Sequence, residues 1–539
     1  MLSFFAIVPV IIAILLYLIP FKKFARVAAL VLQAGLTGGA FYLFFLCRQS
    51  GGELISSVGN FTGAMGIVLK ADTLSSVFVG LASFIFLIAV LYSFTEDVSR
   101  LFWFFLFLWQ GLLNAIFLSR DLFNIFVLIE VVTVVATTMI MFNRDNRSIY
   151  DGMVYLMVNT VAIQFYLFGI GYIYKLTGVL DMTAAAQTLA TLDKAALVLP
   201  FSLIMTAVCL KCALVPLFSW LPKAYRTLSA PAAVSAILSG IHIKSSVYLF
   251  IRCQALFESM DSTGFFLILG IITGIAGFMM ALAQSDIRLI LAYSTVSQVG
   301  LIIAGLNLPG AYSYTGSLYH IINHALFKCM LFLCAGVLER AYGTRDVHQI
   351  RGVLKRMPLV GVAIAMGILG ITGAPFFNGI ISKYFILSGA NGSMTAAILF
   401  INLGTITVFI KYAAMLFGTS AVSMPAPALK IDKCKQAAVL TLGALCLAGG
   451  VLGERFIEFL FGVRMNVSLA GYLEKTAYFI ASAGVGFLLY KYYLQRSKLL
   501  ARIKGFEIGF RGSCVLIGVF FAVILLASNL FMAGGGLAS

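Results

Sequence analysis

The sequence predicts an all-α polytopic membrane protein, and its composition and apolar runs are the basis of that prediction. Of the 539 residues, 61% are hydrophobic and 11% are charged, and the mean hydropathy is +1.04. Soluble domains are about 45–50% apolar and about 25% charged, so this chain cannot cover itself with a polar surface. Apolar runs of about 18–25 residues, the length at which a helix spans hydrocarbon, recur from Leu2 to Met532. Because these runs do not alternate with period two, they exclude a transmembrane barrel.

Turn signals and charges divide the chain into about sixteen predicted spans, within a range of about 14–16. The predicted spans are 3–20, 27–46, 73–95, 101–118, 122–142, 152–174, 197–222, 231–251, 264–283, 289–306, 313–338, 359–389, 395–417, 437–453, 471–490 and 513–533. The segment 1–20 lacks a charged n-region, so we predict that it is the first span and not a cleaved signal.

The basic charge lies between the spans. The net charge is +17, but Lys and Arg gather in short clusters at 22–26, 340–356 and 496–504. This placement is typical of cytoplasmic loops and does not indicate a nucleic-acid partner. With an even number of spans, both termini lie outside. We expect a multi-pass protein of the cell membrane, in the plasma membrane of a prokaryote, in contact with the lipid bilayer.

Two spans carry helix-breaking residues in mid-run. Span 197–222 contains Pro216 and then Pro222, and span 359–389 contains Gly370, Gly373, Pro375 and Gly379. Proline removes an intrahelical donor and clashes with the preceding turn, so both helices should unwind there. Two interrupted spans are typical of an inverted-repeat transporter at its ion path. The alternative for either one is an ordinary proline kink.

Several charges fall inside apolar spans. Glu130 is the one acidic residue deep in a span, about 13 Å along the helix from Asp121. Each central charge costs at least about 2.5–3.5 kcal/mol on insertion scales. The lysines that share this position are Lys211, Lys244, Lys328 and Lys383.

These charges have two explanations. They can pair and merely hold the bundle together, but one acid cannot neutralise all the lysines. They can instead relay protons or cations, because a Glu–Lys contact that is made and broken releases a proton. Lys411 is also buried, but it lies near the end of its span and can snorkel.

A histidine stripe supports the relay. His320, His324 and Lys328 are spaced i, i+4, i+8 and therefore line one face of a helix. Histidine titrates near neutral pH and exchanges protons at both ring nitrogens. For His242 the sequence leaves packing and function equally open, and His348 is predicted to be solvated. Cysteines in the spans, including Cys209 and Cys212, are predicted to pack as small hydrophobes.

The sequence lacks a nucleotide-binding loop, a zinc-protease motif and a cysteine cluster of iron–sulfur spacing. We therefore expect no cofactor and no metal site. Energy for transport must come from an ion gradient or from a partner. Whether the chain acts inside a redox enzyme stays open.

Four ordered motifs resemble the antiporter-like subunits of respiratory complex I, Mrp-type sodium/proton antiporters and membrane-bound hydrogenases. The first is KCALVPLFSWLPKAY from Lys211, followed by SAPAAVSA from Ser229. The others are DIRLILAYSTVSQVG from Asp286, HIINHALFKCMLFLCAG from His320 and GAPFFNGIISKY from Gly373. The resemblance covers roughly residues 70–420. The stretch IHIKSSVYLFIR from Ile241 most resembles the D-type component of Mrp antiporters.

The resemblance implies two inverted five-helix repeats, each with one broken helix, around a polar axis. It places the transmembrane glutamate of the family on Glu130 and its broken-helix lysine on Lys211. The central lysine falls on Lys244 or Lys328, with His320 and His324 beside it, and the exit-side lysine falls on Lys383. Arg288 stands where the family usually has lysine, and it is not expected to relay protons because arginine does not readily release one.

The implied organisation has four parts: 1–98, a first repeat 99–255, a second repeat 256–420, and C-terminal helices 421–539. The implied function is proton and cation translocation in a multi-subunit Mrp-type antiporter. Other membrane subunits are the expected partners, and Na⁺, K⁺ or protons alone remain open as cargo. The main alternative is a proton-pumping subunit of a complex I-like oxidoreductase or energy-converting hydrogenase. A scaffold that has lost transport and a self-contained solute transporter are weaker alternatives.

Overall fold

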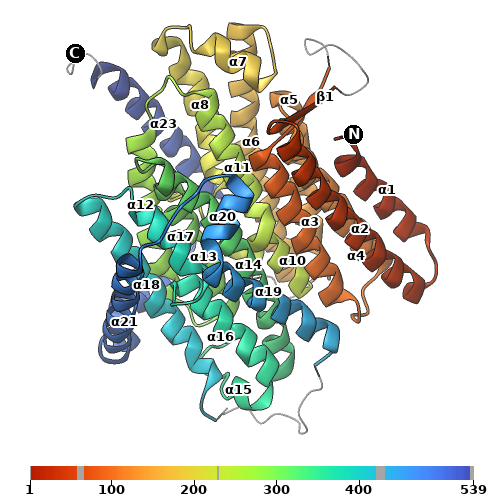
Figure 1. Ribbon diagram of the computed structural model, residues 1–539, viewed down its shortest axis with the longest axis vertical. Helices are drawn as coiled ribbons and strands as arrows, with labels where there is room; N and C mark the ends of the chain where they lie inside the picture. The colour runs from red at the N-terminus through yellow and green to blue at the C-terminus, as the bar shows by residue number, and fades with distance from the viewer. Residues whose placement is uncertain (1, 58–65, 227–229, 420–430, 535–539) are drawn as a thin grey trace.

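The computed structural model describes residues 2–57, 66–226, 230–419 and 431–534, with side chains up to residue 529. It is a bundle of long helices, as the sequence predicts, with one small hairpin near the N-terminus (Figure 1). Ser229, which opens the second half of the first motif, and the predicted boundary at 420 lie outside the described residues.

The elements up to residue 256 run in this order. They are α1 (Phe4–Leu18), α2 (Lys22–Gln49), β1 (Glu53–Ser57), β2 (Val68–Asp72), α3 (Thr73–Ser93), α4 (Arg100–Leu118), α5 (Leu122–Ile140), α6 (Asn146–Thr177), α7 (Met182–Leu189), α8 (Lys194–Lys211), α9 (Trp220–Tyr225), α10 (Ala232–Ile237), the π-helix η2 (Leu238–His242) and α11 (Ile243–Leu256).

The elements after residue 256 are also almost all helices. Its elements are α12 (Thr263–Ala283), α13 (Ile287–Leu306), α14 (Ala311–Tyr342), α15 (Val353–Arg356), α16 (Pro358–Thr372), α17 (Asn378–Leu387), α18 (Ser393–Ala413), the 3₁₀ turn η3 (Ala414–Leu416), α19 (Lys433–Val451), α20 (Gly453–Phe461), α21 (Leu469–Tyr492), the 3₁₀ turn η4 (Leu494–Arg496), α22 (Lys498–Lys504) and α23 (Phe510–Gly534).

Each of the sixteen predicted spans contains helix. Within the described residues, thirteen helices are long and apolar enough to cross a membrane. The helices α1 and α16 are apolar but have only 15 residues each, and α21, with 24 residues, is not among the thirteen. The predicted loop at 22–26 is helical, since α2 begins at Lys22. The strands β1 and β2 pair antiparallel, which the sequence did not indicate.

Aspartate side chains start many of the helices. A carboxylate at the N-cap accepts a hydrogen bond from a backbone N–H that has no partner inside the helix. Capping thus accounts for seven of the twenty acidic residues, which lie at helix starts rather than inside spans. The aspartates that cap in this way are Asp72, Asp121, Asp145, Asp181, Asp193, Asp286 and Asp432.

The first helices of the two halves, with the bridges beside them, repeat at an offset of 165 residues. Asp121 caps α5 and pairs with Asp181 in an isolated bridge, and Asp286 caps α13 and pairs with Asp346 in the same way. The next helices, α6 and α14, both have 32 residues and both end at a glycine in the left-handed region. Each repeat has five spans. Because five is an odd number, the second repeat enters the membrane from the opposite side and is inverted relative to the first. Accordingly, α7 and α15, which follow the two bridges, lie at opposite ends of the molecule (Figure 1).

The helices α12 and α13 cross at glycines. A Cβ at Gly300 would lie 2.4 Å from the Gly274 nitrogen and 2.6 Å from the Gly270 oxygen, so only glycine permits this approach. Small residues are the usual means of close helix packing in membranes.

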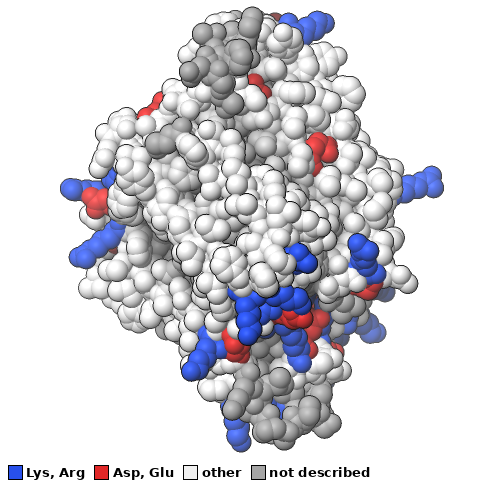
Figure 2. Space-filling view, turned by 90° about the vertical axis from the view of Figure 1, so that its right-hand side faces the viewer, with Lys and Arg blue, Asp and Glu red and all other residues white. Residues whose placement is uncertain are grey.

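Charge is distributed unevenly over the surface. The densest group of Lys and Arg on the face in Figure 2 lies in its lower half, the end at which α15 lies in Figure 1. Most of the surface above it is uncharged. This asymmetry agrees with the predicted cytoplasmic side.

Candidate functional site

The structure breaks the two predicted helices at the expected places. The helix α8 ends at Lys211 and α9 begins at Trp220, with Ala213 at a φ of +54° between them. The helix α16 ends at Thr372 and α17 begins at Asn378, with Gly373 at +79°. Pro222 lies in the first turn of α9, Gly370 in α16 and Gly379 in α17, so these three predicted residues do not take part in the unwound segments.

The Lys211 side chain is buried and points to α5. Its Nζ donates to Thr133 Oγ1 at 2.9 Å, and Thr133 donates to the Ile129 carbonyl at 2.7 Å. Thr133 lies one turn beyond Glu130 on the same helix. Glu130 and Lys211 interact electrostatically but form no ion pair within 4.0 Å among the described residues. The two side chains are therefore not in direct contact in this structure, and the predicted Glu–Lys switch stays a prediction.

Lys383 lies against the second break. Its Nζ donates to the Ile371 carbonyl at 2.7 Å and to Asn402 Oδ1 at 2.6 Å. The Ile371 carbonyl belongs to the last turn of α16, whose carbonyls have no intrahelical partner. A Cβ on Gly373 would lie 3.2 Å from Lys383 Cδ, so the glycine leaves room for the lysine. Unwinding at this site supplies both space and an acceptor for the ammonium group.

The stripe of His320, His324 and Lys328 on α14 is completely buried. His320 Nε2 lies 3.0 Å from Gln298 Oε1, and His320 Nδ1 lies 2.9 Å from Ser382 Oγ on α17. Neither ring nitrogen of His324 has a hydrogen-bond partner among the described residues, so the unprotonated nitrogen of the neutral ring is free to accept a proton. Lys328 Nζ donates to the Leu291 carbonyl at 2.8 Å and also to the Ser294 hydroxyl.

Lys244 is held by the π-helix that precedes it. Its Nζ donates to the Ser239 carbonyl, and the Ser239 hydroxyl lies 3.0 Å from the Thr295 hydroxyl on α13. Single-turn π-helices are frequent at functional sites. Thr295 is the counterpart of Glu130 at the 165-residue offset, so the second repeat carries a hydroxyl where the first carries a carboxylate.

The predicted residues form two groups. Glu130 and Lys211 interact electrostatically with each other, and Lys211 also interacts with His242. The second group is Lys244, His320, His324, Lys328 and Lys383. The charge of Lys244 acts at a distance on His320, His324 and Lys328, and that of Lys383 on His320, without a hydrogen bond or ion pair between any two of them among the described residues. The groups meet at the junction of η2 and α11, where His242 and Lys244 are two residues apart.

The environment of Lys411 differs from the snorkelling position that the sequence allows. Lys411 does not reach water, since its side chain is buried and its Nζ donates to the carbonyls of Leu282 and Gln284. These carbonyls lie at the C-terminal end of α12, where helices bind cations. Arg288 is buried in an ion pair of 2.7 Å with Glu339, and His348 is exposed, as its predicted solvation requires.

His242 is the residue that the sequence left open. Its Nδ1 accepts from the Trp109 indole at 3.3 Å, and its Nε2 lies 3.0 Å from the Tyr155 hydroxyl. It lines a cavity of about 20 Å³ together with Lys211 and Thr133, which is room for about one water. No spacing rule joins His242 to Trp109 or Tyr155, because the three lie on different helices.

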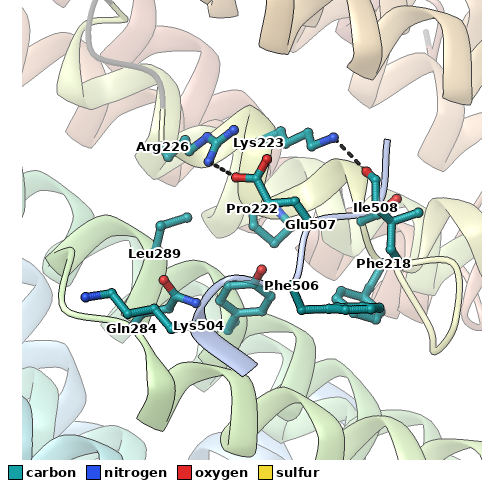
Figure 3. A pocket seen from close by; sticks show the side chains of 12 residues that line it. Phe218, Pro222, Lys223, Arg226, Gln284, Leu289, Lys504, Phe506, Glu507 and Ile508 are labelled. Atoms are coloured by element: carbon teal, nitrogen blue, oxygen red, sulfur yellow. Dashed lines mark hydrogen bonds and ion pairs between the residues drawn. The ribbon is translucent and has the colours of Figure 1, made fainter. Parts of the chain in front are cut away.

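A polar vestibule lies at the predicted cytoplasmic end. It has a volume of about 40 Å³ and is lined by residues of α9, of the α12–α13 turn and of the linker between α22 and α23 (Figure 3). Lys223 Nζ donates to the Ile508 carbonyl at 2.7 Å. Arg226 donates to Glu507 at 2.6 Å and to both carboxylate oxygens of Asp151, at 3.1 and 3.2 Å.

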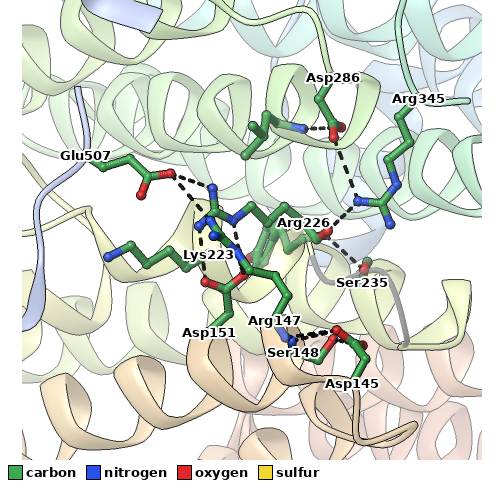
Figure 4. Close-up of polar contacts among 12 residues, drawn as sticks. Asp145, Arg147, Ser148, Asp151, Lys223, Arg226, Ser235, Asp286, Arg345 and Glu507 are labelled. Atoms are coloured by element: carbon green, nitrogen blue, oxygen red, sulfur yellow. Dashed lines mark hydrogen bonds and ion pairs between the residues drawn. The ribbon is translucent and has the colours of Figure 1, made fainter. Parts of the chain in front are cut away.

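The same cluster ties the repeats together. Arg345 donates to the Arg226 carbonyl and lies 3.8 Å from Asp286 Oδ2 (Figure 4). The C-terminal linker is thus attached to both repeats at the mouth of the vestibule.

Comparisons with known proteins agree with this architecture. Residues 119–410 match the family described as NADH:quinone oxidoreductase/Mrp antiporter, transmembrane. The chain is 30% identical to the D-type component of the Na⁺/H⁺ antiporter of Alkalihalophilus pseudofirmus over 370 residues, which cover 66% of this chain and 74% of the relative. It is 33% identical to the N-type component of the NADH-quinone oxidoreductase of Desulforudis audaxviator over 340 residues, 60% of this chain and 66% of the relative.

A solved structure shows the same fold. A chain of the Mrp complex from Dietzia sp. superposes with a TM-score of 0.79 at 22% identity, covering 94% of this chain and 99% of that chain. The protein described here therefore belongs to the NADH:quinone oxidoreductase/Mrp antiporter transmembrane family.

Proposed function

We propose that this chain is the proton- and cation-translocating subunit of a multi-subunit Mrp-type cation/proton antiporter in a prokaryotic plasma membrane. The observation that supports it best is the row of buried ionisable side chains that meets both broken helices. Such side chains are costly in a membrane and are retained for ion paths. The similarity to D-type antiporter components supports the same assignment.

In the proposed mechanism the two repeats, residues 99–255 and 256–420, form one path. Glu130 sets the charge of Lys211 by approaching it or withdrawing, since an opposite charge favours the ammonium form. The proton then passes through Lys244, Lys328, His320 and His324, with water where side chains do not touch. Lys383 releases it at the second break.

The similarity to an N-type component of NADH-quinone oxidoreductase favours a second candidate function. In that case the chain pumps protons within a complex I-like oxidoreductase or an energy-converting hydrogenase. The residues and their roles stay the same, and electron transfer in partner subunits supplies the energy.

Co-purification separates the two functions. The tagged chain is purified from its native membrane in mild detergent, and the subunits that accompany it are identified by mass spectrometry. Small membrane subunits of an antiporter support the first function, and iron–sulfur or nickel subunits support the second. A chain that purifies alone and moves no protons in proteoliposomes contradicts both.

A further inference from the structure

We infer that a cavity behind the short helix α20 binds a phospholipid, which inserts one acyl chain and places its phosphate on Arg48. The cavity has a volume of about 290 Å³, and its walls come from α2, α3, α14, α19 and α20. The helix α20 packs against α3, α14 and α19 and closes the cavity on one side (Figure 1). The inference does not depend on the proposed function, because no residue of the proposed proton path lines this cavity.

A buried glycine faces the unfilled space. Gly80 lies inside α3 and lines the cavity, and a Cβ built on it would meet nothing within 4 Å. A glycine at a close helix crossing behaves differently, since a Cβ on Gly300 would meet backbone atoms. Gly80 therefore leaves room and does not serve close packing. Protein interiors hold few voids larger than a water molecule, so we expect a space of this size to have an occupant.

The walls of the cavity favour an apolar occupant. Aromatic and aliphatic side chains form most of the lining. The polar side chains of the lining each donate to a backbone carbonyl of the protein, and they are Ser76, at 3.0 Å, Tyr319, at 2.6 Å, and Asn323, at 3.1 Å. Because these donors are already used, the cavity suits a hydrocarbon chain better than a polar group. Apolar cavities exclude water and take up apolar ligands.

The cavity runs inward from the surface that faces the bilayer. At its rim, Phe41 and Phe459 are 45% and 39% exposed, whereas Tyr319 and Asn323 at its inner end are 2% and 1% exposed. Large apolar side chains on the outer face of a membrane-spanning bundle meet lipid tails, which are as apolar as leucine. An acyl chain of the surrounding bilayer can therefore enter between the two phenylalanines without crossing a polar surface.

Arg48 supplies the contact for an anionic headgroup. It lies in the last turn of α2, at the end predicted to face the outside, and its Nη1 donates to the Phe459 carbonyl at 2.6 Å. Its Cζ lies 5.8 Å from the ring centroid of Phe459 and 6.0 Å from that of Phe44, and both rings line the cavity. Arg48 is exposed and forms no ion pair among the described residues. Its other N–H groups can therefore bind a phosphate, which complements the unpaired charge beside the cavity.

The test is photolabelling of the purified complex, with its co-purifying subunits, in vesicles of phosphatidylglycerol that carries a diazirine in one acyl chain. Crosslinked residues are identified by mass spectrometry. We expect labelling at the buried inner end of the cavity, on Tyr319 and Asn323, in the wild type. Gly80→Phe fills the cavity and should abolish this labelling. Gly38→Phe is the matched control and should keep it, because Gly38 lies on the exposed face of α2, where a Cβ also meets nothing within 4 Å.

A second variant tests the headgroup contact and does not depend on the folding of Gly80→Phe. Arg48→Gln should raise the lipid concentration for half-maximal labelling of the inner end by about tenfold, the effect of losing one charge-assisted hydrogen bond. Arg464→Gln is its control, because Arg464 is also exposed but is already paired with Glu458, and it should leave that concentration unchanged.

Three results would overturn the inference. The inner end can stay unlabelled in the wild type, or it can be labelled equally in Gly80→Phe and Gly38→Phe. The rim at Phe41 and Phe459 can instead crosslink to a neighbouring subunit, which would show that protein and not lipid covers the cavity. An unchanged half-maximal concentration in Arg48→Gln would overturn the assignment of the phosphate to Arg48.

Discussion

Replacing Lys383 by arginine keeps the charge and removes the ability to give up a proton. Lys383 Nζ has two acceptors, the Ile371 carbonyl at 2.7 Å and Asn402 Oδ1 at 2.6 Å, and a guanidinium group can reach both. The reference pKa of arginine exceeds that of lysine by about 2 or more, which corresponds to at least about 3 kcal/mol in proton release. We therefore expect Lys383→Arg to lower proton flux by at least about hundredfold.

Two further variants separate charge from proton transfer. Lys383→Met should stop transport and also lower the thermal stability of the purified protein, because each acceptor left without a donor costs about 1–3 kcal/mol. Lys383→Glu should restore part of the flux, since a carboxyl group can also bind and release a proton. Flux is measured as pH-gradient dissipation in inverted vesicles at equal expression. An arginine variant with the wild-type rate would show that only the positive charge matters at this site.

Three other predictions concern topology, packing and pH. Cysteines introduced at Ser57 and Ser497 should be labelled by an impermeant reagent from opposite sides of the membrane, and labelling of both from outside contradicts the assigned orientation. Gly300→Ala should destabilise the protein by about 1–3 kcal/mol through overpacking. The control Gly171→Ala should not, because a Cβ at Gly171 meets nothing within 4 Å. Equal melting temperatures of the two variants would refute the close crossing of α12 and α13. The hydrogen bond from its arginine partner lowers the pKa of Glu507, so this carboxylate stabilises the docked linker above the ordinary pKa of glutamate and loses that effect as pH falls through the lowered value. Proteolysis of the linker should accelerate in that acid range, and a rate that does not change with pH excludes the contact.

Local signals in the sequence were sufficient for the helices and the breaks. Pro216 and the group around Pro375 identified the two unwound segments, because their effect on a helix does not depend on neighbours. The i, i+4, i+8 spacing placed His320, His324 and Lys328 on one buried face of α14, as observed. The burial of Lys244 was predictable because a charge in the middle of an apolar span has no route to water.

Contacts between distant helices were not predictable in this way. The partner of Lys211 is Thr133, 78 positions away, and the partner of His242 is Tyr155, 87 positions away. From its position near a helix end Lys411 is able to snorkel, but its side chain instead donates to the C-terminal carbonyls of α12 inside the protein. A single sequence does not contain these pairings.

The central claim is that buried charge at the first broken helix carries the transported proton. Cation-driven proton flux through the purified complex, compared between wild type, Glu130→Gln and Lys211→Met, tests it most directly. We predict that both variants assemble in the membrane in wild-type amounts and that neither moves protons, because each removes one half of the switch that sets the charge of the lysine. Near-wild-type flux in either variant would contradict it.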